Sequence, residues 1–136
     1  MCIRDRFDIG HGSGSFSWEV SYALAEQGFW PDSISTDVHT SSIKAPVSVD
    51  MPNCMSKLLH LGMPLVEVVR ASTQTAAELI GWQDRIGSLE VGREADVAVL
   101  VLEEGEFPFT DSYRREERAT RRLVARHTIR AGERLV

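Results

Sequence analysis

The sequence has few cysteines, and it lacks any long apolar run. Its two cysteines, Cys2 and Cys54, form neither a disulfide framework nor the close spacing of a metal-binding motif. This usage fits a reducing compartment, so we expect a cytoplasmic protein. No apolar stretch approaches the roughly 18 residues that a membrane-spanning helix needs, and the first residues lack the apolar region of a secretory signal. We therefore expect no membrane partner.

The sequence also lacks an excess of positive charge. Its 20 acidic residues outnumber its 15 lysines and arginines, and they give a formal net charge of −5 at pH 7. A domain that binds nucleic acid ordinarily carries a basic patch, so we expect no nucleic-acid partner. The 136 residues are enough to bury a sizeable hydrophobic core.

Two short apolar runs near the N-terminus predict a pair of parallel strands. They occupy residues 7–10 and 33–36, and residues 17–28 between them have helical spacing of apolar side chains. Val20 and Leu24 are expected to face the core from this helix. A strand, a helix and a second strand within about thirty residues predict a βαβ unit, in which the strands are parallel.

Three further helices are predicted in residues 53–81, each closed by a glycine or a hydroxyl residue. Asn53 is expected to cap the first of them, with Met55, Leu58 and Leu59 facing the core. The other two helices follow a proline and a threonine further along the chain. Together they predict a packed helical flank beside the strand pair.

The composition changes near residue 83, where glycines begin to separate runs rich in valine and leucine. This pattern predicts a small β module. A proline at position 108 would confine its strand to the edge of a sheet. The expected elements are a buried strand over residues 96–102, a second strand over 107–110, a hairpin of 123–130 with 134–136, and a solvated charged connection over 114–122.

Four stretches of the sequence together carry a resemblance to a known enzyme family. They are Phe7-Asp8-Ile9-Gly10-His11-Gly12-x-Gly14-Ser15-Phe16, Ser35-Thr36-Asp37-Val38-His39, Arg70-Ala71-Ser72-Thr73-x-x-x-Ala77-x-x-Ile80-Gly81 and Ile86-Gly87-Ser88-Leu89-x-Val91-Gly92-x-x-Ala95-Asp96-Val97. With these stretches the sequence resembles the amidohydrolase superfamily, and within it the dihydroorotase-like deacetylases and aminoacylases. The resemblance implies an α/β fold: the C-terminal part of a (β/α)8 barrel, with strands 7 and 8 and their helices, followed by part of a small β-sandwich.

The resemblance also implies how the chain is divided. Residues 7–83 would form part of the metal-dependent hydrolase barrel, and residues 84–136 would form part of the C-terminal β-sandwich module. Residues 1–6 continue no pattern, and we expect them to be a non-native leader. The family's His-x-His pair and its later histidine ligands have no counterpart in this sequence. We therefore expect a C-terminal fragment that is inactive alone.

Asp37 is the strongest candidate for a catalytic residue. It follows a predicted buried strand, and parallel α/β barrels keep their chemistry at such strand ends. The resemblance implies that Asp37 is both the proton carrier and a neighbour of a divalent metal, with zinc the expected ion and most of its ligands absent from this chain. From the residues alone, the alternative is an aspartate that caps the following loop.

His11, Gly12 and His39 are the candidate substrate-binding residues. His11 lies between two glycines at a predicted strand end, where backbone and imidazole can approach a ligand closely. The alternative is that the His11 ring binds a backbone carbonyl and orders the loop. His39 faces either the same pocket as Asp37 or solvent. The two remaining histidines are expected to be structural: His60 on the surface of a helix, and His127 in a strand.

These residues leave two classes of function open. The first is a metal-dependent hydrolase that acts on C–N bonds of a small-molecule amide, with an N-acyl group as the expected substrate. A cyclic amide or a deaminase substrate is the alternative within that class, because the same closing motifs serve those enzymes too. The second class is a non-catalytic dihydroorotase-like scaffold. Either class is compatible with a homo-oligomer.

Overall fold

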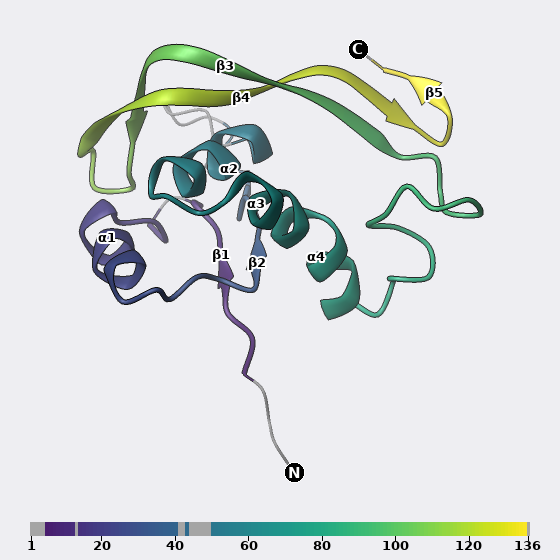
Figure 1. Ribbon diagram of the computed structural model, residues 1–136, viewed down its shortest axis with the longest axis horizontal. Helices are drawn as coiled ribbons and strands as arrows, with labels where there is room; N and C mark the ends of the chain where they lie inside the picture. The colour runs from purple at the N-terminus through teal and green to yellow at the C-terminus, as the bar shows by residue number, and fades with distance from the viewer. Residues whose placement is uncertain (1–4, 13, 41–42, 44–49, 136) are drawn as a thin grey trace.

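The computed structural model describes residues 5–12, 14–40, 43 and 50–135, which fold as helices between two separate sheets (Figure 1). In chain order the elements are β1 (Asp8–Ile9), α1 (Trp18–Glu26), β2 (Ser33–Ile34), α2 (Met51–His60), α3 (Leu65–Ser72), α4 (Gln74–Leu79), β3 (Val97–Thr110), β4 (Glu116–Arg130) and β5 (Glu133–Arg134). This mixed α/β arrangement agrees with the predicted class. Across the described ranges, no helix combines the length and the apolar character needed to cross a membrane.

The first sheet is the parallel pair that the sequence predicts. Asp8 of β1 lies opposite Ser33 of β2, and Ile9 lies opposite Ile34. The hydroxyls of Ser33 and Ser35 both donate to the Asp8 carboxylate, at 2.5 Å each. Each strand is shorter than expected, with only two residues in ladder geometry.

Helix α1 forms where predicted, but it buries a different face. Trp18 and Ser21 point into the core, whereas Val20 is 58% exposed and Leu24 is 37% exposed. The prediction that Val20 and Leu24 face the core is therefore wrong for this chain. The indole of Trp18 decides the orientation, because it is fully buried and packs edge-on against Phe16.

Helix α2 provides most of the helical core, as its spacing predicts. Met55, Leu58 and Leu59 are all buried. The N-cap lies three residues earlier than expected, because the Asp50 carboxylate accepts a hydrogen bond from the backbone N–H of Asn53 at 2.8 Å. Asp50, rather than Asn53, is therefore the N-cap.

The second sheet is a long antiparallel ribbon with a short third strand, in the order β3-β4-β5. The two predicted strands over 96–102 and 107–110 form one 14-residue strand, with a register shift between Glu104 and Phe107. Pro108 lies on β3 at the edge of the sheet, as expected. The sheet is less buried than predicted, because no residue between 96 and 102 is fully buried.

The charged run that was expected to be a connection is part of β4. Its side chains pair with acidic residues across the ribbon: Arg122 lies 2.9 Å from Glu103, and Arg118 lies 3.5 Å from Glu106. Opposite charges that face each other on adjacent strands stabilise their pairing modestly. The predicted hairpin is present, with a two-residue turn at residues 131–132.

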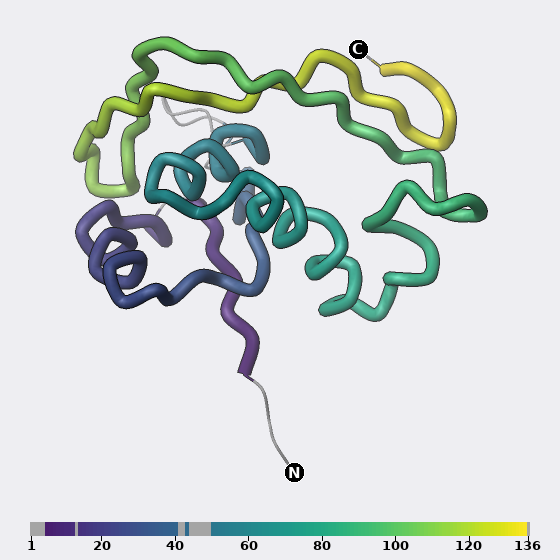
Figure 2. Tube along the Cα trace, in the orientation of Figure 1, coloured from purple at the N-terminus to yellow at the C-terminus, as the bar shows by residue number. Residues whose placement is uncertain are grey.

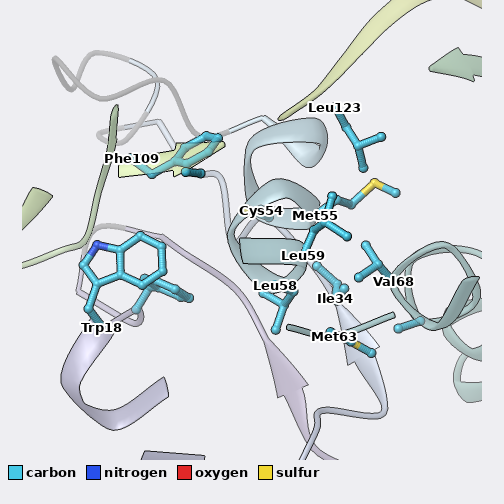
Figure 3. Packing of buried hydrophobic residues seen from close by; sticks show 13 residues of the cluster. Trp18, Ile34, Cys54, Met55, Leu58, Leu59, Met63, Val68, Phe109 and Leu123 are labelled. Atoms are coloured by element: carbon cyan, nitrogen blue, oxygen red, sulfur yellow. The ribbon is translucent and has the colours of Figure 1, made fainter. Parts of the chain in front are cut away.

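One hydrophobic cluster joins the helices to the ribbon (Figure 3). In this view Leu123 of β4 lies beside Met55 of α2, and Phe109 of β3 lies near Trp18 of α1. The core therefore crosses residue 83, where the composition of the sequence changes. The trace in Figure 2 shows the same ribbon running from the neighbourhood of α1 at one end to the C-terminal hairpin at the other.

Candidate functional site

Asp37 lies just beyond β2, at the end where the strand pair opens to the surface. Its side chain is exposed, and its backbone has a φ of +50°, a left-handed conformation that aspartate tolerates better than most residues. Ser15, in the loop that follows β1, donates its hydroxyl hydrogen to Asp37 Oδ2 at 3.1 Å. Residues held in such sparsely populated conformations cluster at functional sites.

Two glycines of the loop after β1 make room for Asp37. A Cβ atom on Gly10 would lie 2.9 Å from Asp37 Cβ, and one on Gly12 would lie 2.2 Å from Asp37 Oδ2. Gly12 also has a φ of +48°, and its N–H donates to the carbonyl of Thr36 at 3.0 Å. The loops that follow the two strands are therefore in direct contact, and only glycine at position 12 leaves space for the carboxylate.

His11 lies under this loop rather than on its surface. Its side chain is 4% exposed and stacks on the ring of Phe16. Nδ1 lies 3.1 Å from the carbonyl oxygen of Gly12, and Nε2 lies 3.2 Å from that of Thr110. This geometry corresponds to the alternative role given above, in which the ring binds backbone carbonyls and orders the loop.

The structure brings Gly12 and Ser15 to Asp37, and it places His39 further along the same exposed segment. The backbone carbonyl of His39 accepts a hydrogen bond from Ile43 N at 3.1 Å. Asp37 and His39 are both exposed, and the role of His39 in substrate binding stays a prediction.

The other two histidines lie away from Asp37. His60 is half-buried, and its Nε2 lies 3.1 Å from the hydroxyl of Tyr22. Its ring also meets Trp18 edge-on, so the surface location expected for it is wrong. His127 lies on β4, as predicted, opposite Val99.

Sequence reasoning missed a buried lysine next to the site. Lys57 of α2 is fully buried, and its Nζ donates to the carbonyl of Thr110 at 2.6 Å. The same nitrogen lies 5.0 Å from the centroid of the Phe16 ring. Burial lowers the pKa of Lys57 to about 8, although Cys54 and Asp111 oppose this shift. The sequence signal was weak: a single lysine between the apolar residues of a helix.

An apolar hollow of about 320 Å³ lies between β1 and α1. It is lined by exposed apolar side chains, among them Phe7, Val20, Leu24 and Phe29, and Ser15 contributes to its wall. Contiguous apolar surface of this kind is ordinarily covered by another part of a protein or by a partner.

The described residues do not complete a metal site. No three side chains of His, Cys, Asp or Glu group together within the described part of the chain. Asp37 offers one exposed carboxylate, whereas catalytic zinc sites usually hold their ion with about three protein ligands. These residues alone therefore do not fit a complete metal centre.

Comparison with known proteins shows which family and which relatives the sequence is similar to. A family model described as "Amidohydrolase family" matches residues 19–130. The chain is 40% identical over 128 residues to a deacetylase from Agrobacterium fabrum, and 38% identical over 130 residues to a deacetylase from Brucella anthropi. Each match covers 94% of this chain but only 31% of the relative, so the chain spans about a third of the length of these curated relatives.

Solved structures share the same arrangement of elements. A crystal structure of an adenine deaminase superposes with a TM-score of 0.86 at 31% identity, over 95% of this chain and 35% of that one. A crystal structure of a dihydroorotase superposes with a TM-score of 0.84 at 37% identity, over 96% of this chain and 35% of that one.

Proposed function

The chain belongs to the amidohydrolase family, and we propose that it contributes Asp37 to the hydrolysis of a C–N bond by a longer enzyme. The observation that carries this proposal is the exposed Asp37 carboxylate, held at a strand end by Ser15 and fitted against Gly12. In this role Asp37 accepts a proton from the attacking water and delivers it to the leaving nitrogen.

The position of Asp37 supports a partial barrel. We propose that β1 and β2 are strands 7 and 8 of a (β/α)8 barrel, and that the β3-β4-β5 ribbon belongs to an accompanying β-sandwich. In such barrels the catalytic residues lie at the C-terminal ends of the strands, where Asp37 lies here. The apolar hollow beside β1 is the surface that preceding barrel elements would cover.

Amidohydrolases generally use divalent metals, and we propose zinc as the ion of the whole enzyme. Asp37 is the ligand that this chain would supply. The remaining ligands would come from outside the described residues, since these offer no group of three.

We propose an N-acyl amide as the substrate, because two of the matched relatives are named deacetylases. A cyclic amide or a deaminase substrate is the second candidate, favoured by the similarity to a dihydroorotase and to an adenine deaminase. The substrate would lie against Gly12 and His39 at the exposed strand end, while His11 supports the same loop from beneath. The cytoplasmic location and the homo-oligomer stay predictions.

The test replaces Asp37 in the longer enzyme. Asp37→Asn keeps the size of the side chain but removes the base, so it should reduce turnover of the preferred amide by roughly 10² or more. Asp50→Asn is a matched control, because asparagine caps a helix as well as aspartate does and Asp50 lies at the start of α2. Turnover within about twofold of wild type for Asp37→Asn would overturn the proposal.

Comparing an N-acetyl amine with a cyclic amide as substrates would distinguish the two candidates. We expect a higher kcat/KM for the N-acetyl amine. If the intact enzyme acts on neither of them and on no deaminase substrate, the non-catalytic scaffold would be the better description.

A further inference from the structure

The turn between β3 and β4, residues 111–115, is hydrogen-bonded to the loop that approaches Asp37. Ser112 makes three of these contacts. Its N–H donates to the carbonyl of Phe16 at 3.0 Å, and its hydroxyl oxygen accepts from the Phe16 N–H at 3.2 Å. The same hydroxyl donates to the carbonyl of His11 at 3.2 Å. The backbone on both sides of residues 12–15 is therefore attached to one serine.

Asp111, next to this serine, joins the turn to the start of α1. Its buried carboxylate accepts from the N–H of Trp18 at 3.1 Å, and also from the N–H groups of Tyr113 and Arg115 at 2.8 Å each. Ser17, the residue at the N-cap position, makes no side-chain capping bond. The Asp111 carboxylate, which is distant in the sequence, thus accepts a hydrogen bond from a backbone N–H at the start of α1 that the Ser17 side chain does not pair.

The end of β3 supplies one more contact to this region. The carbonyl of Thr110 lies 2.6 Å from Lys57 Nζ and 3.2 Å from His11 Nε2. Three successive residues, 110–112, therefore hold the loop after β1, the start of α1 and the buried face of α2. Figures 1 and 2 show this end of the ribbon reaching down to α1.

The opposite side of the same loop faces Asp37. The N–H of Gly12 donates to Thr36, and the hydroxyl of Ser15 donates to the Asp37 carboxylate. The loop is thus fixed between the β3–β4 turn on one side and the strand end on the other. Losing the bonds to the turn would therefore remove one of the two attachments that fix Ser15 relative to Asp37.

We propose that Ser112 and Asp111 are positioning residues, which hold the described residues of the loop, 11–12 and 14–16, so that Gly12 and Ser15 orient the Asp37 carboxylate. The β3–β4 turn then acts on the candidate site through hydrogen bonds to the backbone of the loop and of the start of α1. The catalytic meaning of this arrangement rests on the proposed function of Asp37, whereas the anchoring of the loop does not.

Ser112→Ala tests the anchoring, and Ser56→Ala is its matched control. Ser56 also links the ribbon to the helices, because its hydroxyl donates to Pro52 and accepts from the N–H of Leu123. Neither of these two bonds of Ser56 involves the loop that approaches Asp37. Both variants therefore lose a serine hydroxyl that bridges the two layers, but only Ser112→Ala removes hydrogen bonds to the loop.

Hydrogen–deuterium exchange on the full chain gives the first measurement. Ser112→Ala should accelerate exchange in peptides covering residues 11–16 by roughly tenfold, a change typical of losing hydrogen bonds that close a segment. Ser56→Ala should leave these peptides unchanged, and Ser112→Thr, which keeps a hydroxyl, should restore protection. Equal exchange at residues 11–16 in Ser112→Ala and wild type would overturn the proposal.

Kinetics of the intact enzyme give the second measurement. Ser112→Ala should lower kcat by roughly tenfold and leave KM within about twofold, because misplacing a catalytic group costs turnover more than binding. A loosened loop with unchanged kcat would overturn the positioning role. An active Asp37→Asn enzyme would contradict the proposed function instead, and the exchange result would still stand because it does not depend on turnover.

Discussion

Gly12 and Asp37 are in such close contact that a Cβ atom on Gly12 would lie 2.2 Å from Asp37 Oδ2. Real Cβ atoms do not approach other heavy atoms this closely, so the carboxylate can keep its place only while residue 12 is glycine. The left-handed φ of +48° at Gly12 adds a second reason for glycine at this position.

Gly12→Ala should therefore displace the Asp37 carboxylate and reduce turnover of the intact enzyme by roughly tenfold or more. Gly28→Ala is the matched control, because Gly28 also has a left-handed φ, of +69°, but has open space where a Cβ would be. Both variants should lose about 1–2 kcal/mol of stability from backbone strain, measured by thermal unfolding. Equal turnover in the two variants would show that the contact with Asp37 is unimportant.

Lys57 should make stability depend on pH. Burial lowers its pKa to about 8 in the folded chain, whereas an unfolded lysine has a pKa of about 10.4. Between these values the unfolded chain binds more protons at Lys57, so this residue should increase stability by roughly 1–3 kcal/mol as pH rises from about 8 to 10.4. Urea unfolding across this pH range would measure the free energy of unfolding of wild type and of Lys57→Met. The rise with pH that Lys57 causes in wild type should be absent in the variant.

Cys54 must be controlled in that experiment, because its effect has the opposite sign. Burial raises the pKa of its thiol to about 11, above the value of about 8.5 for an unfolded cysteine. The stability from the protonated thiol is present below about pH 8.5 and is lost as pH rises towards 11. Both proteins should therefore carry Cys54→Ala. A pH dependence that is identical with and without Lys57 would contradict the prediction.

The turn between β4 and β5 offers a stabilising substitution. Ala131 and Gly132 both have positive φ, of 49° and 82°, as expected for a two-residue hairpin turn. Ala131→Gly removes the strain at the first position and should raise stability by about 0.5–1 kcal/mol. Ala125→Gly, within β4, should instead lower stability, because glycine weakens a strand interior. If thermal unfolding shows that Ala131→Gly and Ala125→Gly both raise or both lower stability, this prediction is wrong.

Val20 and Leu24 should behave differently in the chain and in a longer enzyme. They line the apolar hollow beside β1 and are exposed in this structure. Replacing both with glutamine should increase the soluble yield of the 136-residue chain and hardly change its stability. In a longer enzyme that covers the hollow, the same change should cost roughly 2–5 kcal/mol. An unchanged stability there would argue against the proposed barrel position.

The sequence by itself determined the family and several of the local elements. Apolar spacing predicted the parallel strand pair and the core face of α2, and residues 131–133 predicted the hairpin, whose turn is one residue shorter than expected. The stretch ending in Asp37 and His39 identified the strand end that carries the candidate site. These features depend on residues close together in the chain, so periodicity and turn chemistry are sufficient to predict them.

The tertiary structure alone decided which groups surround that strand end. The burial of Lys57 and the orientation of His11 both depend on the carbonyl of Thr110, and the start of α1 depends on Asp111, which is 93 positions from Trp18. No local pattern marks such pairs. A buried polar group takes whichever partner the packed core brings within hydrogen-bonding distance, because leaving it unpaired costs more than any local preference.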